Sequence, residues 1–143
     1  GHGEPNTPHL LFDNMIAPLV PYALRGAIWY QGESNESAPE RYARLLRDLV
    51  GDWRRQWGRA DLAFHLVQLP GFRAPLAHEP ESRWARLREA QASILELPHT
   101  GIAIALDGGD AGNIHPVDKA SVGERLAQSE LARAYGRAGL VPN

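Results

Sequence analysis

Three short apolar runs constrain this chain more than any other feature of its sequence. They cover residues 26–30 (GAIWY), 62–69 (LAFHLVQL) and 101–106 (GIAIAL), and each is followed at once by polar or turn-forming residues. Each run is largely apolar at both odd and even positions, which is typical of strands buried on both faces of a parallel sheet. The sequence therefore predicts a sheet of about three strands.

Amphipathic helical patterns separate these runs. Apolar residues recur at three- and four-residue spacing over 42–57 and 84–95, and again in a stretch that we expect to begin near Pro116 and to end at Gly136. A shorter apolar piece, residues 10–20, predicts a further helix before the first strand. Alternating helices and strands predict an α/β fold, with a parallel sheet and helices on both of its faces.

The length of the chain fits one domain rather than two. Three strands are few for a parallel α/β sheet, and the sequence starts without a methionine. We therefore expect residues 1–143 to form a single, truncated domain. The irregular stretch 71–81 is expected to be a surface loop.

Composition argues against several classes of partner and site. The 15 Lys and Arg residues against 17 Asp and Glu give a net charge of −2, which argues against general binding of nucleic acid or anionic membranes. No apolar run reaches the roughly 18 to 20 residues that span a bilayer. The chain has no cysteine, which excludes disulfides and a cysteine nucleophile and leaves the cellular compartment open. The six histidines show no metal-ligand spacing, so we expect no metal site.

Polar residues follow the predicted strands directly. Gln31, Glu33 and Asn35 follow the first run, and Asp110 and His115 follow the third. The carboxyl ends of parallel strands meet at one edge of a sheet, where ligands bind. A histidine there can take and return a proton, a carboxylate can orient it, and amides can stabilise an oxyanion. The collection predicts acyl transfer.

These residues also have structural interpretations, which the sequence leaves open. His115 is equally compatible with a loop or capping role; at a helix start, the helix dipole would keep its imidazole neutral. Glu33 and Glu36 fit the start of a helix that Ser37 caps in a capping box with Glu40, and Asn35 fits a turn.

The order of the motifs resembles that of the sialate O-acetylesterases, which are carbohydrate esterases of the SGNH-hydrolase superfamily. The resemblance runs from about Leu10 to Tyr135. It implies a flavodoxin-like α/β fold and hydrolysis of acetyl esters of sialic acid or a related sugar by Ser-His acyl transfer, with no metal or organic cofactor. The segments that carry it are WYQGESN (29–35), YARLLRDLVGDWRRQWG (42–58), LAFHLVQLPGF (62–72), WARLREAQ (84–91) and NIHPxxKxxxGxRLA (113–127).

The same resemblance implies roles for individual residues. His115 is similar to the catalytic base of the family. Gln31 and Asn35 lie in the block that supplies oxyanion contacts, without a decision as to which amide does so. Glu33 matches the glutamate of that motif and is expected to support the site from behind.

The acid partner of His115 stays open. Superfamily members commonly have Asp three residues before the histidine, where this chain has Gly112, and Asn113 stands at a nearer position that some relatives fill with Asp. Asp110, Asp107 or a backbone carbonyl are the remaining candidates.

The nucleophile is the larger departure. The catalytic serine of the family lies in a Gly-x-Ser-Asn-type block well before WYQGESN, and this chain has no such block. Ser34 resembles a nucleophile elbow only loosely, because Glu36 replaces the second glycine. We therefore expect the nucleophile to be missing, and the isolated chain to be catalytically poor.

Two other functions remain possible from the sequence. One is an esterase that acts on acetyl xylan or another polysaccharide, and the other is a non-catalytic carbohydrate-binding remnant. The expected partner is an acetylated sugar. A sheet of three strands is also expected to expose an open edge that favours self-association.

Overall fold

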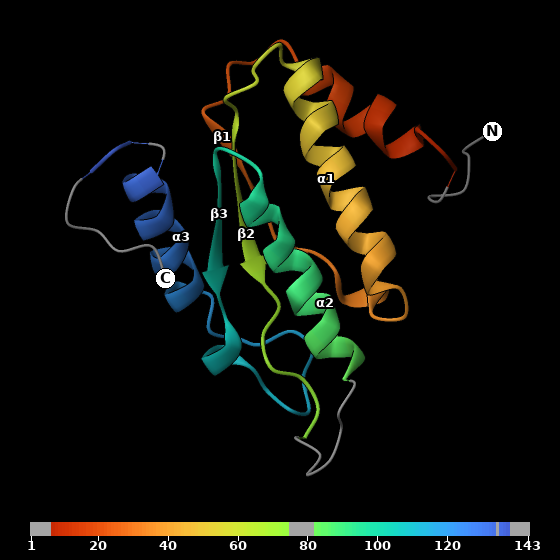
Figure 1. Ribbon diagram of the computed structural model, residues 1–143, viewed down its shortest axis with the longest axis vertical. Helices are drawn as coiled ribbons and strands as arrows, with labels where there is room; N and C mark the ends of the chain where they lie inside the picture. The colour runs from red at the N-terminus through yellow and green to blue at the C-terminus, as the bar shows by residue number, and fades with distance from the viewer. Residues whose placement is uncertain (1–6, 75–81, 134, 138–143) are drawn as a thin grey trace.

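A parallel three-stranded sheet forms the centre of the computed structural model, which describes residues 7–74, 82–133 and 135–137 (Figure 1). The strands are β1 (Gly26–Trp29), β2 (Ala63–Gln68) and β3 (Thr100–Ile104), in the order β1-β2-β3. In the described ranges, β1 has a strand neighbour on one side only. The predicted α/β class and the three strands are confirmed.

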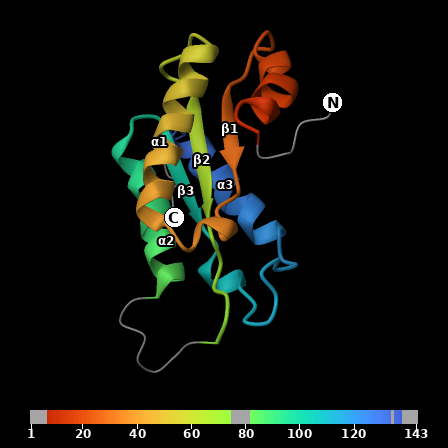
Figure 2. The ribbon, with the colours of Figure 1, turned by 90° about the vertical axis from the view of Figure 1, so that its right-hand side faces the viewer.

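The helices cover both faces of this sheet (Figures 1 and 2). The helices α1 (Pro39–Gln56) and α2 (Arg83–Ala92) lie on one face, and α3 (Ala120–Arg133) lies on the other. The predicted helix over residues 10–20 is present as two short helical turns, Phe12–Ile16 and Ala17–Leu19. No helix in the described part of the chain has the length and hydropathy needed to cross a bilayer. The stretch 71–81 lies within the described residues only as far as residue 74.

Alternation along the strands divides the core between the two faces. In β2, Phe64 and Leu66 pack with α1 and α2, whereas Val67 packs with α3. The larger cluster joins the sheet to α1 and α2, and the smaller one joins it to α3. Members of the larger cluster are Tyr42, Leu46, Val50, Phe64, Leu66, Leu69, Trp84, Leu87, Ile94 and Ile102. Those of the smaller are Val67, Ala103, Ala105, Val122 and Leu126.

Two helix starts differ from expectation. The helix α3 begins at Ala120 rather than near Pro116, because the Asp118 carboxylate accepts hydrogen bonds from the backbone N–H (3.2 Å) and the hydroxyl (2.5 Å) of Ser121. The helix α1 begins directly at Pro39 with no side-chain cap, so the capping box at Ser37 is wrong. Proline suits this first helical position, where no backbone N–H is needed.

Candidate active site

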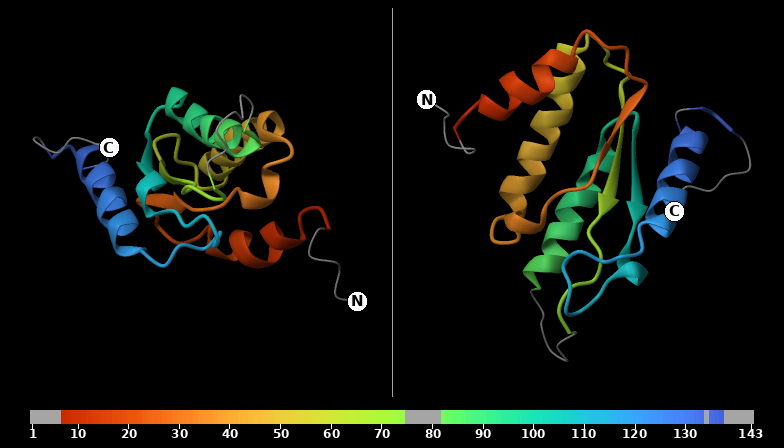
Figure 3. Two further views of the ribbon diagram at one scale, coloured as in Figure 1. Left: turned by 90° about the horizontal axis from the view of Figure 1, so that it is seen from below. Right: turned by 180° about the vertical axis from the view of Figure 1, so that it is seen from behind.

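The loops that leave the three strands lie together at the end toward which the strand arrows point. This is the lower end in Figure 1, and Figure 3 shows it from below. The loop after β3 lies directly against the loop after β2, because a Cβ atom added to Gly109 would stand only 2.5 Å from the Gly71 nitrogen. Only glycine allows this approach of two backbones.

Arg73 joins all three loops. Its backbone N–H donates to the Ala111 carbonyl (3.2 Å) in the loop after β3. Its guanidinium binds both carboxylate oxygens of Glu36 in the loop after β1, at 2.7 and 3.1 Å. The residue has a positive φ of 66°, a conformation that is uncommon for a side chain other than glycine. The three loops are therefore fixed relative to one another by one residue.

The structure brings Gln31 and Asn35 together, as the sequence predicts. The Gln31 Nε2 donates to Asn35 Oδ1 at 3.0 Å, and both side chains are half-buried. Asn35 ends the 3₁₀ turn Glu33–Asn35, and its N–H donates to the Gly32 carbonyl at 2.7 Å. Glu33 opens the same turn and is half-buried. The turn therefore presents two amides side by side.

His115 is exposed on a loop that is held from both sides. Ile114 packs against the larger core cluster, and Pro116 is buried. The Asn113 Oδ1 accepts the backbone N–H of His115 at 2.9 Å, so Asn113 shapes the turn and does not orient the ring. Because α3 starts five residues later, His115 lies outside the first helical turn, where the helix dipole acts.

A contact between Lys119 and Tyr30 connects the loop that carries His115 to the end of β1. The Lys119 Nζ lies 3.3 Å from the Tyr30 hydroxyl and 4.6 Å from the centre of its ring. Tyr30 directly precedes Gln31. The loop that bears the imidazole therefore lies at the same edge as the amide pair.

The two carboxylates considered as partners of His115 have other contacts. Asp107 is bound by Arg125, which lowers the pKa of its carboxyl to about 2. Asp110 Oδ1 accepts the backbone N–H of Gly112 at 2.8 Å. Within the described ranges, neither carboxylate hydrogen-bonds to the His115 ring.

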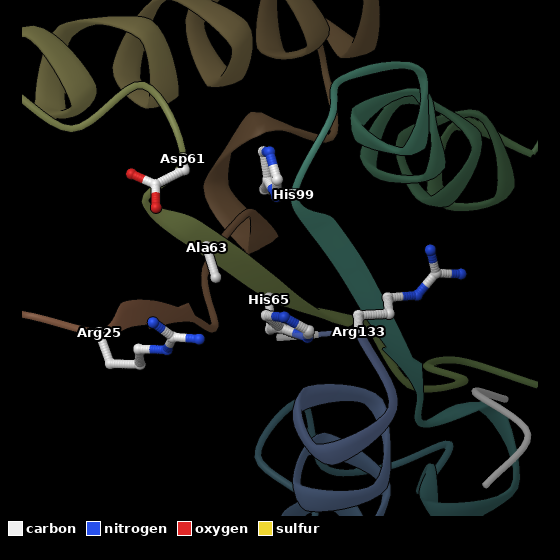
Figure 4. Close-up of a pocket in the computed structure, with 6 residues that line it drawn as sticks. All are labelled: Arg25, Asp61, Ala63, His65, His99 and Arg133. Carbon is white, nitrogen blue, oxygen red and sulfur yellow. The ribbon is translucent and has the colours of Figure 1, made fainter. Parts of the chain in front are cut away.

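The other end of the sheet holds a pocket of about 190 Å³ (Figure 4). None of the residues predicted for catalysis lies in it, and its walls come from the amino ends of the strands and the last turn of α3. The lining residues are Arg25, Asp61, Ala63, His65, His99 and Arg133.

Behind this pocket lies a polar cluster that the sequence analysis did not identify. His65 Nδ1 lies 3.0 Å from Ser129 Oγ, and its Nε2 lies 2.7 Å from a carboxylate oxygen of Glu130. Burial lowers the pKa of His65, against the opposing effect of Glu130. Ser, His and Glu are triad residue types, but Ser129 is completely buried between α3 and the sheet. Because no substrate carbonyl can reach this hydroxyl, we interpret the cluster as part of the core.

The donors of a metal site are also not assembled in the residues that the structure describes. No group of three or more His, Asp or Glu side chains is close enough to share an ion there.

Comparisons with known proteins agree on one family. The model of the family "carbohydrate esterase, sialic acid-specific acetylesterase" matches residues 7–132. The sialate O-acetylesterase of Mus musculus is 33% identical over 95% of this chain and 28% of its own length. The human sialate O-acetylesterase is 32% identical over 95% of this chain and 29% of its own length.

A solved structure shows the same relationship. The crystal structure of a carbohydrate acetylesterase from Xanthomonas citri superposes with a TM-score of 0.85 and 41% identity, over 91% of this chain and 31% of that chain. This chain thus spans less than a third of the length of each of these relatives.

Proposed function

The chain belongs to the family of sialic acid-specific carbohydrate acetylesterases, and on that premise we propose that it forms the histidine-bearing part of an active site that hydrolyses O-acetyl esters of sialic acid or a related sugar. One observation carries the proposal. The Lys119 Nζ lies 3.3 Å from the Tyr30 hydroxyl, so the loop of His115 contacts the end of β1, directly before the Gln31–Asn35 amide pair.

The reaction is a two-step acyl transfer. A serine hydroxyl attacks the acetyl carbonyl while His115 accepts its proton, and the imidazolium then gives that proton to the departing sugar oxygen. In the second step, water attacks the acetyl-serine ester while His115 accepts its proton. The proton then returns to the serine oxygen as acetate leaves. Because Asn35 Oδ1 already accepts from Gln31, the Asn35 Nδ2 is the group that would donate to the oxyanion, with Gln31 orienting it.

The attacking serine is proposed to come from outside these 143 residues, in keeping with a single but truncated domain. Ser34 is exposed in the middle of the 3₁₀ turn, and Ser129 is buried beside His65. This chain covers less than a third of its relatives, so most of their length lies outside the matched segment and has room for the nucleophilic serine.

Asp110 is the proposed acid partner of His115. Its neighbour Asp107 is committed to Arg125, whereas Asp110 uses only Oδ1 for the Gly112 N–H. Glu33 is proposed to support the amide turn from its half-buried position at the start of that turn.

The experiment compares release of acetate from O-acetylated sialic acid and from acetylated xylan by the intact protein that carries this chain. His115→Ala should lower kcat by about 10² to 10⁴-fold, the usual contribution of a general base. Ser34→Ala should leave kcat unchanged. Loss of turnover in Ser34→Ala would place the nucleophile in this chain instead.

A broader carbohydrate substrate is the second candidate. The relative from Xanthomonas citri carries the general description of a carbohydrate acetylesterase, without sialic acid in its name. Faster deacetylation of xylan than of sialic acid would favour this candidate. Saccharide binding that survives in His115→Ala, without any turnover in the intact protein, would instead favour a non-catalytic binding module.

Self-association through β1 is also proposed. In the described ranges β1 pairs only with β2, and the side chain of Ile28 on it is 67% exposed. An exposed apolar edge favours strand pairing with another chain. Light scattering of the full chain should show dimers or larger species at high concentration, and a monomer there would exclude this.

A further inference from the structure

Two buried polar side chains, Tyr42 and Gln91, converge on one backbone atom beside the amide pair. The Tyr42 hydroxyl donates to the Gln31 carbonyl oxygen at 2.9 Å, and Gln91 Nε2 donates to the same oxygen at 3.1 Å. Tyr42 lies on α1 and Gln91 lies on α2, so both helices fix the same point of the chain. One carbonyl thus uses both of its lone pairs on side chains from the core.

Gln91 also fixes the neighbouring strand. Its side chain is completely buried, and its Oε1 accepts the backbone N–H of Leu69 at 2.9 Å, just past the end of β2. The ends of β1 and β2 are therefore held by one amide. A buried amide of this kind is costly unless its groups are paired, and here both ends are.

The backbone after Gln31 lies close against the same two side chains. Gly32 has a φ of 148°, and a Cβ atom added there would stand 3.3 Å from Gln91 Nε2 and 3.4 Å from the Tyr42 ring. The amide turn is therefore seated directly on the two side chains. Burial raises the pKa of the Tyr42 hydroxyl, which keeps it protonated and able to donate.

We propose that Tyr42 and Gln91 are positioning residues of the esterase: they fix the backbone of Gln31 so that its side chain orients Asn35 toward the oxyanion. This rests on the proposed function. It goes beyond it because neither residue lies in the loops that carry the predicted chemistry. Displacement of a reacting group by about 1 Å can cost a hundredfold in rate, which makes such support matter.

The test is Tyr42→Phe in the intact protein that carries this chain, because this change removes one hydroxyl and keeps the ring. We expect kcat for acetyl ester hydrolysis to fall about tenfold to a hundredfold with KM nearly unchanged. Gln91→Met should act in the same direction. The matched control is Gln68→Met, which removes an amide that also bonds α2, at the Arg88 carbonyl, but does not reach Gln31.

A double-mutant cycle separates positioning from general destabilisation. If Tyr42 acts through Gln31, then Tyr42→Phe should cost little further activity in a Gln31→Ala background. Full additivity, or unchanged kcat in both Tyr42→Phe and Gln91→Met while His115→Ala is inactive, overturns the positioning role alone. Unchanged kcat in both His115→Ala and Gln31→Ala overturns the proposed function and this inference with it.

Discussion

Arg125 binds both carboxylate oxygens of Asp107, with each guanidinium nitrogen 2.6 Å from its oxygen. The same Nη1 also donates to the Ile104 carbonyl at 2.6 Å, so the pair connects α3 to the end of β3. Because the Asp107 carboxylate already has a cationic partner, we propose Asp110 rather than Asp107 as the partner of His115.

The first prediction compares the two aspartates. Asp110→Asn should lower kcat by about 10² to 10⁴-fold, because the neutral amide no longer orients or stabilises the imidazolium of His115. Asp107→Asn is the matched control. It should leave kcat unchanged and should alter the free energy of unfolding little, because the ion pair is exposed to solvent. Activity that survives in Asp110→Asn would favour a backbone carbonyl as the partner.

A second prediction concerns the bidentate pair of Arg73 and Glu36. Lysine keeps the charge but cannot bind both oxygens at once, so Arg73→Lys should loosen the loop after β1 against the loop after β2. The backbone bond from Arg73 to Ala111 stays in place. We expect kcat to fall about tenfold, with little change in the free energy of unfolding because the pair is partly exposed. Arg47→Lys is the control, since Arg47 pairs with Glu96 away from these loops. Equal effects of the two changes on kcat would argue against a loop-fixing role.

The apolar runs were sufficient to predict the three strands, and burial on both faces holds for most of β2. It is wrong for β1, which has no buried residue and on which the side chain of Ile28 is 67% exposed. The meeting of Gln31 with Asn35 was likewise predictable, since they lie four residues apart in one motif. Contacts between distant segments were not. The bond from Gln91 to the Gln31 carbonyl joins residues 60 positions apart, and an isolated glutamine in a helical pattern gives no sign of its partner.

Helix starts show the same limit. Pro116 is an ordinary helix-start signal, yet α3 begins later because Asp118 caps Ser121. Competition between two start signals depends on which side chain finds its backbone partner, and that depends on the packing of the whole loop. The contacts of His65 with Ser129 and Glu130 were not predictable for a related reason. The sequence of a strand does not indicate which helix will pack on it.

Acid should destabilise the fold through His65. Burial holds its pKa below the ordinary value of 6.5, so the unfolded chain takes up the proton first as the pH falls through 6.5. The free energy of unfolding should therefore fall with decreasing pH from that point, by up to about 1.4 kcal/mol per pH unit. Urea unfolding of the full chain at several pH values measures this slope.

The control for that slope replaces the histidine. His65→Gln should flatten the pH dependence near 6.5, because glutamine does not titrate. His99→Gln changes an exposed histidine that lines the same pocket and serves as the matched variant. If His65→Gln and the original chain show the same slope, other groups are responsible for the acid sensitivity.

The last prediction concerns the space between β3 and α3. A Cβ atom at Gly101 would stand 2.5 Å from Ser129 Oγ and 2.6 Å from His65 Nδ1, and all three residues are buried. Gly101→Ala should therefore lower the free energy of unfolding by about 1 to 3 kcal/mol or more, because strand and helix must separate. Gly123→Ala provides the contrast. Gly123 lies on the exposed side of α3 with open space around it, so alanine there should raise the free energy of unfolding by up to about 1 kcal/mol. If urea unfolding gives changes in free energy of opposite sign for the two variants, the close approach of Gly101 to His65 and Ser129 sets the position of α3. If Gly101→Ala leaves the free energy of unfolding unchanged, α3 can move away from β3 at no cost.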